Sequence, residues 1–271
     1  MRFVLFLIAL SGLAPAQRPG FNLATVEQDI ALGEQAAREV EQQSVVLDHP
    51  AIQAYVNHIG ARLAGTLQST PFRFRFQVVV NPEVNAFALP GGRMFINTGM
   101  IIAARSESEL AAVMGHEMAH VLLRHGTGGQ SRDQVIGQIA ELGAQLLERK
   151  FGSDSAAAVT TRIGAQFAAN SLTRKFGRNQ ERDADVLGVK MMAAGSFNPD
   201  AAVNFWLRQS ASRAGGNKFS RLFDTHPTDE SRARNLGALS QQLSAPAGFR
   251  ETGLFVDFQR FVHHAAQRAA R

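Results

Sequence analysis

The stretch that decides the fold is LAAVMGHEMAHVLL, residues 110–123. His116 and His120 stand four residues apart, so on an α-helix both imidazoles project from one face, close enough to share a tetrahedral zinc ion. Glu117 follows the first histidine, and its carboxylate can reach a water on that metal without binding the metal itself. The rest of the stretch is almost entirely apolar, and buried polar groups need partners. The sequence therefore predicts a metal site on a buried helix.

A zinc ion that takes part in catalysis needs a third protein ligand and an open position. A third histidine six residues after His120 is absent, because Gly126 stands there. His125 lies about 180° around the helix from His116 and about 140° from His120, at about 100° per residue. We therefore interpret His125 as a cation that the helix C-terminus favours, and expect the third ligand to be a carboxylate on a later helix.

Three glutamates compete for the third position: Glu141, Glu148 and Glu181. Only Glu181 has an acidic residue, Asp185, four positions later on the same helix face. Outer carboxylates of this kind accept a hydrogen bond from a ligand imidazole. The spacing favours Glu181 as the ligand and Asp185 as the outer partner, although an exposed salt-bridging role for Glu181 explains the spacing equally well.

Hydrophobic periodicity divides the chain into helices, a small sheet and further helices. Apolar residues recur at helical spacing over 26–40 and 52–63. Alternation over 72–80 predicts a strand with one buried and one wet face, and 85–89 and 94–97 predict two more strands joined by a tight turn at 90–92. Later helices are expected at 106–125, 131–150, 156–175, 179–194, 199–213 and 228–243. The predicted class is α+β, mostly helical, with about three strands packed beside the helix of His116.

Composition excludes several classes of protein. The chain has 271 residues, of which 45% are hydrophobic and 19% charged, values near the norm for globular proteins. It has no cysteine, which excludes disulfides and thiolate metal sites. The formal net charge of +5 comes almost wholly from scattered arginines. This pattern favours a solvated basic surface over nucleic-acid binding.

The N-terminus has the layout of a secretory signal peptide. Arg2 supplies a positive start, residues 3–13 are apolar, and Ala14-Pro15-Ala16 fits a small-residue cleavage site. The apolar run is shorter than the roughly 20 residues that a membrane span needs. We therefore expect a signal peptide over 1–16 and no stable span in the mature chain. One domain is then expected over 17–244, followed by a C-terminal extension of uncertain order over 245–271.

Taken together, these motifs resemble the HtpX and CAAX-prenyl-protease-like zinc metallopeptidases, especially their soluble periplasmic branch of the beta-barrel assembly-enhancing protease type. The resemblance extends from about Leu32 to Leu236. The segments that carry it are NAFALPGG at 85–92, GMI at 99–101, ELAAVMGHEMAH at 109–120, RH at 124–125, ERDAD at 181–185 with Gly188, and THP at 225–227 with Arg232.

The resemblance implies a zincin-like fold of the gluzincin type with one zinc ion per chain. The implied zinc ligands are His116, His120 and Glu181, with Glu117 as the general base that activates water. The implied localisation is the periplasm.

The late THP motif implies a role near the metal cleft for two further residues. His226 and Arg232 are expected to stabilise the oxyanion. For His226 two alternatives stay open: it is a residue at the start of a helix, before Pro227, or it occupies the open position of the zinc and blocks it.

The implied function is a zinc endopeptidase acting on unfolded or misassembled cell-envelope proteins, with polypeptide substrates and envelope or outer-membrane assembly partners. The strand Asn85, Ala86, Phe87, Ala88 is expected to present its edge to an extended peptide. Two other classes stay open. A non-catalytic zinc-stabilised chaperone or scaffold would not need Glu117, and a zinc hydrolase of a non-peptide amide would enclose its site in a pocket. Residues 126–178 are candidates for a lid over the zinc.

Overall fold

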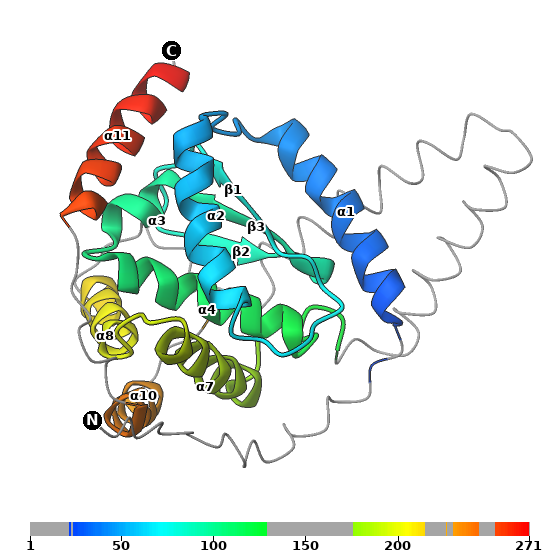
Figure 1. Cartoon of the computed structure of the whole chain (residues 1–271), viewed down its shortest axis with the longest axis vertical. Helices are drawn as coiled ribbons and strands as arrows, with labels where there is room; N and C mark the ends of the chain where they lie inside the picture. The colour runs from blue at the N-terminus through cyan, green and yellow to red at the C-terminus, as the bar shows by residue number, and fades with distance from the viewer. Residues whose placement is uncertain are drawn as a thin grey trace, which may run out of the picture.

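A computed structural model shows the fold (Figure 1) and describes residues 22, 24–128, 176–214, 226, 230–243 and 253–270. Its centre is a sheet of three strands, β1 (Arg75–Val79), β2 (Ala86–Ala88) and β3 (Arg93–Asn97). The strand order is β1-β3-β2, with β3 parallel to β1 and antiparallel to β2. The predicted α+β class, mostly helical with a small sheet, is confirmed.

Strands β2 and β3 form a hairpin that closes on helix α1 (Val26–Gln43). The connection is a short 3-10 helix, η1 (Pro90–Gly92), in which Gly91 has a φ of 80°. Residues with a side chain rarely adopt this conformation. A Cβ on Gly91 would also lie 2.6 Å from the Cα of Ile30, so glycine lets the turn pack directly against α1.

Both faces of the sheet are covered, which differs from the predicted wet face. One face packs into the main core with α2 (Pro50–Ala64) and α4 (Glu107–Leu122). The other face packs against α1 through a smaller apolar cluster, whose strand residues are Val79, Phe87 and Phe95. Part of the predicted wet face is nevertheless kept, because Arg75 is exposed. Gln77 is partly buried and accepts a hydrogen bond from Arg93 at 2.6 Å.

Helix α4 begins at a side-chain cap and ends earlier than predicted. The Ser106 Oγ accepts a hydrogen bond from the Glu109 N–H at 3.2 Å, as N-cap residues do. The helix ends at Leu122, and Arg124 follows with a φ of 55°. A short helix that the sequence analysis did not predict, α3 (Thr98–Ala103), connects β3 to this cap.

Helices α7 (Arg178–Ala194), α8 (Asp200–Ala214) and α10 (Glu230–Leu243) lie below α4 in Figure 1. Helix α7 crosses α4 where Gly188 meets Gly115. A Cβ on Gly188 would lie 2.9 Å from the backbone nitrogen of His116 and 3.0 Å from the carbonyl carbon of Gly115. This close backbone contact sets the first half of α7 beside the histidine face of α4.

The C-terminal helix α11 (Leu254–Ala269) is part of the main core. Phe255, Phe258 and Val262 are buried, and the ring of Phe258 stacks on Tyr55 of α2 with the centroids 4.0 Å apart. The Gln259 side chain donates to the carbonyl of Ala104 at 2.6 Å. The segment that the sequence left as an extension of uncertain order therefore contains a helix packed on the domain.

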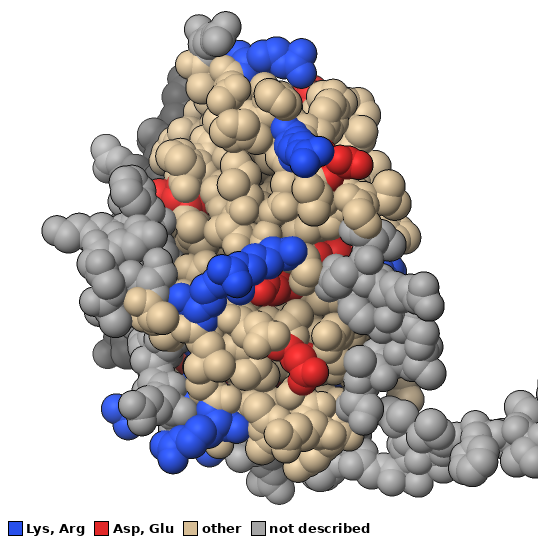
Figure 2. Space-filling view, turned by 90° about the vertical axis from the view of Figure 1, so that its left-hand side faces the viewer, with Lys and Arg blue, Asp and Glu red and all other residues tan. Residues whose placement is uncertain are grey.

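Several predicted segments lie outside the described residues: the signal peptide at 1–16, the helices at 131–150 and 156–175, and most of the candidate lid at 126–178. Within the described part of the chain, no helix combines the length and apolar character that crossing a membrane requires. On the face drawn in Figure 2, basic and acidic side chains are interspersed over a largely uncharged surface.

Candidate metal centre

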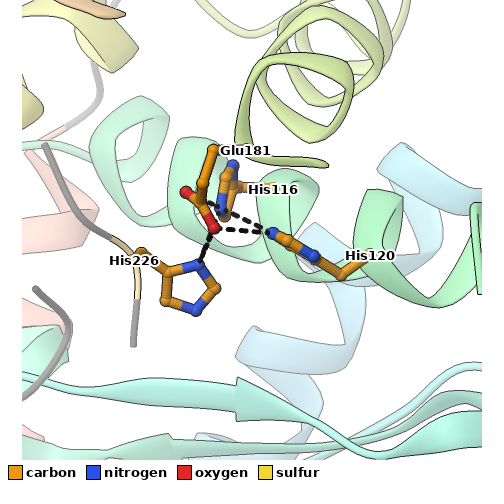
Figure 3. A group of neighbouring side chains, drawn as sticks. All are labelled: His116, His120, Glu181 and His226. Atoms are coloured by element: carbon orange, nitrogen blue, oxygen red, sulfur yellow. Dashed lines mark hydrogen bonds and ion pairs between the residues drawn. The ribbon is translucent and has the colours of Figure 1, made fainter. Parts of the chain in front are cut away.

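Four side chains from three parts of the chain converge at one buried point (Figure 3). His116 and His120 come from α4, and Glu181 comes from the first turn of α7. His226 comes from a separate segment and faces Glu181. None of the four is more than 3% exposed. Their candidate ligand atoms all lie within 4.8 Å of one another. The structure thus brings together the three expected ligands and places His226 with them.

The separations of the donor atoms fit a single small cation. The Nε2 of His116 lies 3.1 Å from the Nε2 of His120 and 3.2 Å from the Nδ1 of His226. The Oε1 of Glu181 lies 3.5 Å from the Nε2 of His120 and 2.9 Å from the Nδ1 of His226, and its Oε2 lies 3.5 Å from the Nε2 of His116. Ligands bound tetrahedrally to zinc at about 2.0–2.1 Å are about 3.3 Å from one another. These donor separations, 2.9–3.5 Å, are therefore close to those of a tetrahedral zinc site.

The charges around these donors also call for a cation. Glu117, Glu181 and Asp185 are buried together with Arg232, so three carboxylates and one guanidinium give a net formal charge of −2 when the imidazoles are neutral. The Oε1 of Glu117 and the Oε2 of Glu181 accept no well-aligned hydrogen bond, although they lie 3.1 Å from His226 and 2.7 Å from Arg232. Unsatisfied buried oxygens are costly, and a divalent cation would balance the charge.

Burial and the carboxylates act in opposite directions on the imidazoles. Burial lowers the pKa of His120 to about 3, so this ring is neutral, as a metal ligand must be. Burial also opposes a charge on His226, but in the absence of a metal Glu117 and Glu181 outweigh it and raise the pKa of His226 to about 9, so His226 would have to release a proton to bind a cation. Burial similarly opposes the charges of Glu117 and Glu181, and the same attraction to His226 holds the pKa of both carboxyls below their usual range.

His116 is supported by charged residues behind it. Its Nδ1 lies 3.0 Å from the Oδ1 of Asp185, the residue expected as an outer partner. Arg232 donates to Asp185 through Nε at 2.6 Å and Nη2 at 2.8 Å, and its guanidinium lies 4.1 Å from the ring centre of Trp206. The Trp206 ring packs edge-on against His116. Arg232, expected at the oxyanion, is thus paired with the carboxylates of α7.

His120 is supported by His125, contrary to the expectation that His125 points away. The Nδ1 atoms of the two rings lie 3.0 Å apart. Helix α4 ends at Leu122 and not at the predicted residue 125, and the turn at Arg124 carries His125 back toward His120. The glycines from residue 126 onward indicate a helix end near residue 125, whereas the left-handed turn at Arg124 has no signal in the sequence. Sequence analysis also missed Phe176, whose ring centroid lies 4.1 Å from that of His120.

Glu117 lies between the donor cluster and the edge strand β2. The backbone N–H of Ala88 donates to the Oε2 of Glu117 at 3.1 Å. The other oxygen, Oε1, faces the Nε2 of His226 at 3.1 Å. A cavity of about 20 Å³, room for roughly one water, is lined by Glu117, His120 and Ala88 among others. A larger cavity, about 230 Å³, lies between α7 and α10 and is lined by Glu181 and Arg232.

The expected substrate strand, β2, is an edge strand of the three-stranded sheet that the described residues form. Backbone groups of Asn85 and Leu89 bond to β3, so those of Ala86 and Ala88 point to the outer edge. Ala88 is partly exposed, whereas Ala86 is 2% exposed. The edge is therefore accessible near Glu117 and covered further along.

Comparisons with known proteins match this chain to a family of peptidases and to proteins named as proteases. The family model of Peptidase family M48 matches residues 50–240. The beta-barrel assembly-enhancing protease of Yersinia pestis is 29% identical over 238 residues, 83% of this chain and 48% of that protein. The protein of the same name from Shigella flexneri is 28% identical over 218 residues, 78% of this chain and 44% of that protein.

A more distant relative is the mitochondrial metalloendopeptidase OMA1 of Schizosaccharomyces pombe, which is 25% identical over 224 residues, 82% of this chain and 64% of that protein. The chain spans about half the length of the first relatives. The family match covers most of the chain and includes all four donors. The chain therefore belongs to peptidase family M48.

Proposed function

We propose that this chain is a zinc-dependent endopeptidase that hydrolyses extended, unfolded or misassembled proteins of the cell envelope. The observation that carries the proposal is the position of Glu117. Its carboxylate lies beside a full set of metal donors and is bonded to the strand along which a peptide would lie. The family and the printed names of the relatives, which are proteases and metalloendopeptidases, support the same activity.

His116, His120 and Glu181 would hold the zinc ion. When bound there, zinc supplies Lewis acidity, which polarises a peptide carbonyl and makes water a better proton donor. Glu117 Oε1 takes the proton from the attacking water and gives it to the leaving amine as the C–N bond breaks. The carboxylate is thereby restored for the next cycle. At rest, His226 holds the pKa of the Glu117 carboxyl below its usual range, so the group is already deprotonated before the site opens.

His226 is the group that would have to move before reaction. Catalytic zinc sites keep one position open, but the Nδ1 of His226 stands at the fourth position among the donors. Its Nε2 faces Glu117 at the same time. One displacement of His226 would therefore open the fourth position and release the general base. We propose that His226 blocks the site at rest, and that Arg232 positions Glu181 and Asp185 instead of acting on the oxyanion.

The extended substrate would lie along the outer edge of β2. The backbone carbonyl of Ala88 and the backbone groups of Ala86 point to that edge. Backbone bonding of this kind requires an extended substrate backbone but discriminates little between side chains, which suits unfolded proteins as substrates. A periplasmic location is part of the proposal and rests on the signal sequence at 1–16, so the mature protein should begin at Gln17.

One observation favours a second function, a zinc-stabilised scaffold without catalysis. Structural zinc sites have four protein ligands, and the described centre offers four. Such a scaffold has no use for a buried carboxylate that is not a ligand, and Glu117 is 2% exposed. The two functions differ in whether Glu117 matters for cleavage and whether removing His226 exposes an activity.

The test uses the chain from Gln17 onward, its Glu117→Gln variant and His226→Ala with and without Glu117→Gln. Zinc content is measured by elemental mass spectrometry, and cleavage of casein is followed with and without a zinc chelator. We expect about one zinc per chain in every protein. Cleavage should be sensitive to the chelator and fall by roughly 100-fold or more in both proteins that carry Glu117→Gln. Equal cleavage with and without Glu117→Gln would contradict the proposal, and zinc bound without any cleavage would favour the scaffold.

A further inference from the structure

We infer that His125 positions the metal ligand His120, and that helix α1 holds His125 in place through Arg124. The inference rests on the proposed metal site but concerns the outer face of His120, to which the proposed reaction assigns no group. Two residues that are not metal donors, Arg124 and His125, together with helix α1, would then help to set the geometry of the metal site.

The contact between the two imidazoles has the geometry of an outer-shell hydrogen bond. The Nε2 of His120 faces the other donors, so its proton lies on Nδ1, which is 3.0 Å from the Nδ1 of His125. His120 therefore donates, and a neutral His125 accepts. A hydrogen bond at this nitrogen fixes the ring orientation and the tautomer of a metal-bound histidine. His125 is 8% exposed, so water has little access to replace it.

The contact depends on an unusual backbone turn. Arg124 has a φ of 55°, a conformation that residues with a Cβ disfavour. The turn is closed by two backbone hydrogen bonds, from the His125 N–H to the His120 carbonyl at 2.9 Å and from the Gly128 N–H to the Arg124 carbonyl at 2.8 Å. A chain that left α4 with ordinary dihedral angles would direct the His125 ring elsewhere.

Helix α1 supplies the interactions that hold this turn. The guanidinium of Arg124 donates to the carboxylate of Asp29 and to the carbonyl of Ala24, just before α1 begins. Asp29 is 1% exposed, so the carboxylate end of the ion pair is shielded from solvent. The contacts form a continuous path from Asp29 through Arg124 and His125 to His120. The start of α1 is in this way connected to a metal ligand that lies about ninety residues later in the chain.

The first experiment compares zinc affinity in the mature protein and three variants, by competition with a chromophoric chelator. His125→Ala removes the acceptor. His125→Asn places an amide oxygen near the position of Nδ1. His58→Ala, on the exposed side of α2, is the matched control. The visible absorption of the cobalt-substituted proteins gives a second readout, because it reports ligand geometry directly.

We expect His125→Ala to bind one zinc with affinity weakened by roughly 10-fold to 100-fold and to shift the cobalt spectrum. His125→Asn should recover much of the affinity, and His58→Ala should match the wild type. Wild-type affinity and spectrum in a folded His125→Ala protein would overturn the inference and leave the proposed function intact. Absence of zinc binding in the wild type would instead overturn the proposed function.

The second experiment tests whether the left-handed turn at residue 124, which α1 holds in the wild type, controls the position of His120. Arg124→Gly and Arg124→Ala are both made in an Asp29→Asn background, so neither protein keeps the ion pair or an unpaired buried charge. The two proteins then differ at residue 124 only, where glycine accepts the left-handed conformation and alanine does not. We expect zinc affinity to be several-fold higher with glycine. Equal affinities would show that the turn does not control the ligand.

Discussion

The two histidines of α4 lie one turn apart, yet their surroundings differ. His116 is backed by Asp185, Arg232 and Trp206, which belong to three other helices far along the chain. His120 is backed by His125, only five residues later, through a contact between two imidazoles. One ligand is thus supported by long-range charged contacts, and the other by a local turn.

This difference acts on the two rings electrostatically. Burial opposes a positive charge on both. At His116 the carboxylates of Asp185 and Glu181 outweigh burial and raise the pKa, whereas at His120 burial prevails and lowers the pKa to about 3. A carboxylate behind an imidazole strengthens it as a metal donor. We therefore expect His116, with a carboxylate behind it, to hold a bound metal more firmly than His120.

Substitution of Glu181 should have the largest effect on zinc binding, because Glu181 lies close to both His116 and His120. Its oxygens lie 3.5 Å from the Nε2 of His116 and from that of His120. Glu181→Ala removes a ligand that faces both, so we expect the folded protein to lose most of its zinc in a metal titration. Glu141→Ala serves as the matched control because Glu141 is a rival candidate from the sequence. Loss of zinc from that control alone would assign the third ligand to Glu141.

Asp185→Ala tests the charged residues that support His116. It leaves the first ligands in place but removes the acceptor for His116 and the partner of Arg232, so zinc affinity should weaken by roughly 10-fold to 100-fold. The loss should exceed that of His125→Ala, because a charged acceptor is lost and not a neutral one. Parallel chelator competitions with both variants measure the difference. A larger loss at His125 would reverse the proposed ranking of the two ligands.

Gly188→Ala tests whether the contacts of His116 with Asp185 and Arg232 depend on the close crossing of α4 and α7. The new methyl group would meet backbone atoms of His116 and Gly115, which cannot move cheaply. We expect a loss of about 1–3 kcal/mol in the free energy of unfolding, as for other overpacked sites, together with weaker zinc binding. Gly237→Ala, with no atom within 4 Å of its Cβ, is the control for urea unfolding. Similar urea unfolding curves for both variants would show that the helix crossing accommodates an added methyl group.

The smallest expected effect concerns His226, which lies between the two histidines and Glu117. If His226 blocks the fourth position, His226→Ala should cleave casein several-fold faster than the wild type while still binding zinc, because the remaining three donors are those of a catalytic site. Turnover and zinc content are measured on the same sample. A fall of roughly 100-fold with zinc retained would show that His226 stabilises the oxyanion.

Local patterns in the sequence predicted the core of the molecule well. The three strands, the turn at Gly91 and the buried helix of His116 follow from periodicity and residue type, because each depends on neighbours in the chain. The same local reasoning failed at His125, where one left-handed residue changed the direction of the side chain. Trp206 and the cover of the second sheet face by α1 were not foreseen, since both arise from contacts between distant segments. Helix α11 was not predicted, although Phe255, Phe258 and Val262 recur at helical spacing in the sequence.

The position of Trp206 gives the protein an intrinsic optical reporter. The chain has a single tryptophan, and its ring centroid lies 5.4 Å from that of His116, with the Arg232 guanidinium over its face. Tryptophan emission from the whole protein therefore originates at the edge of the metal centre. Titration with paramagnetic cobalt should quench it in proportion to occupancy, while diamagnetic zinc should change it only through the surroundings of the indole. Binding kinetics at this centre can thus be followed by stopped-flow fluorescence without a label.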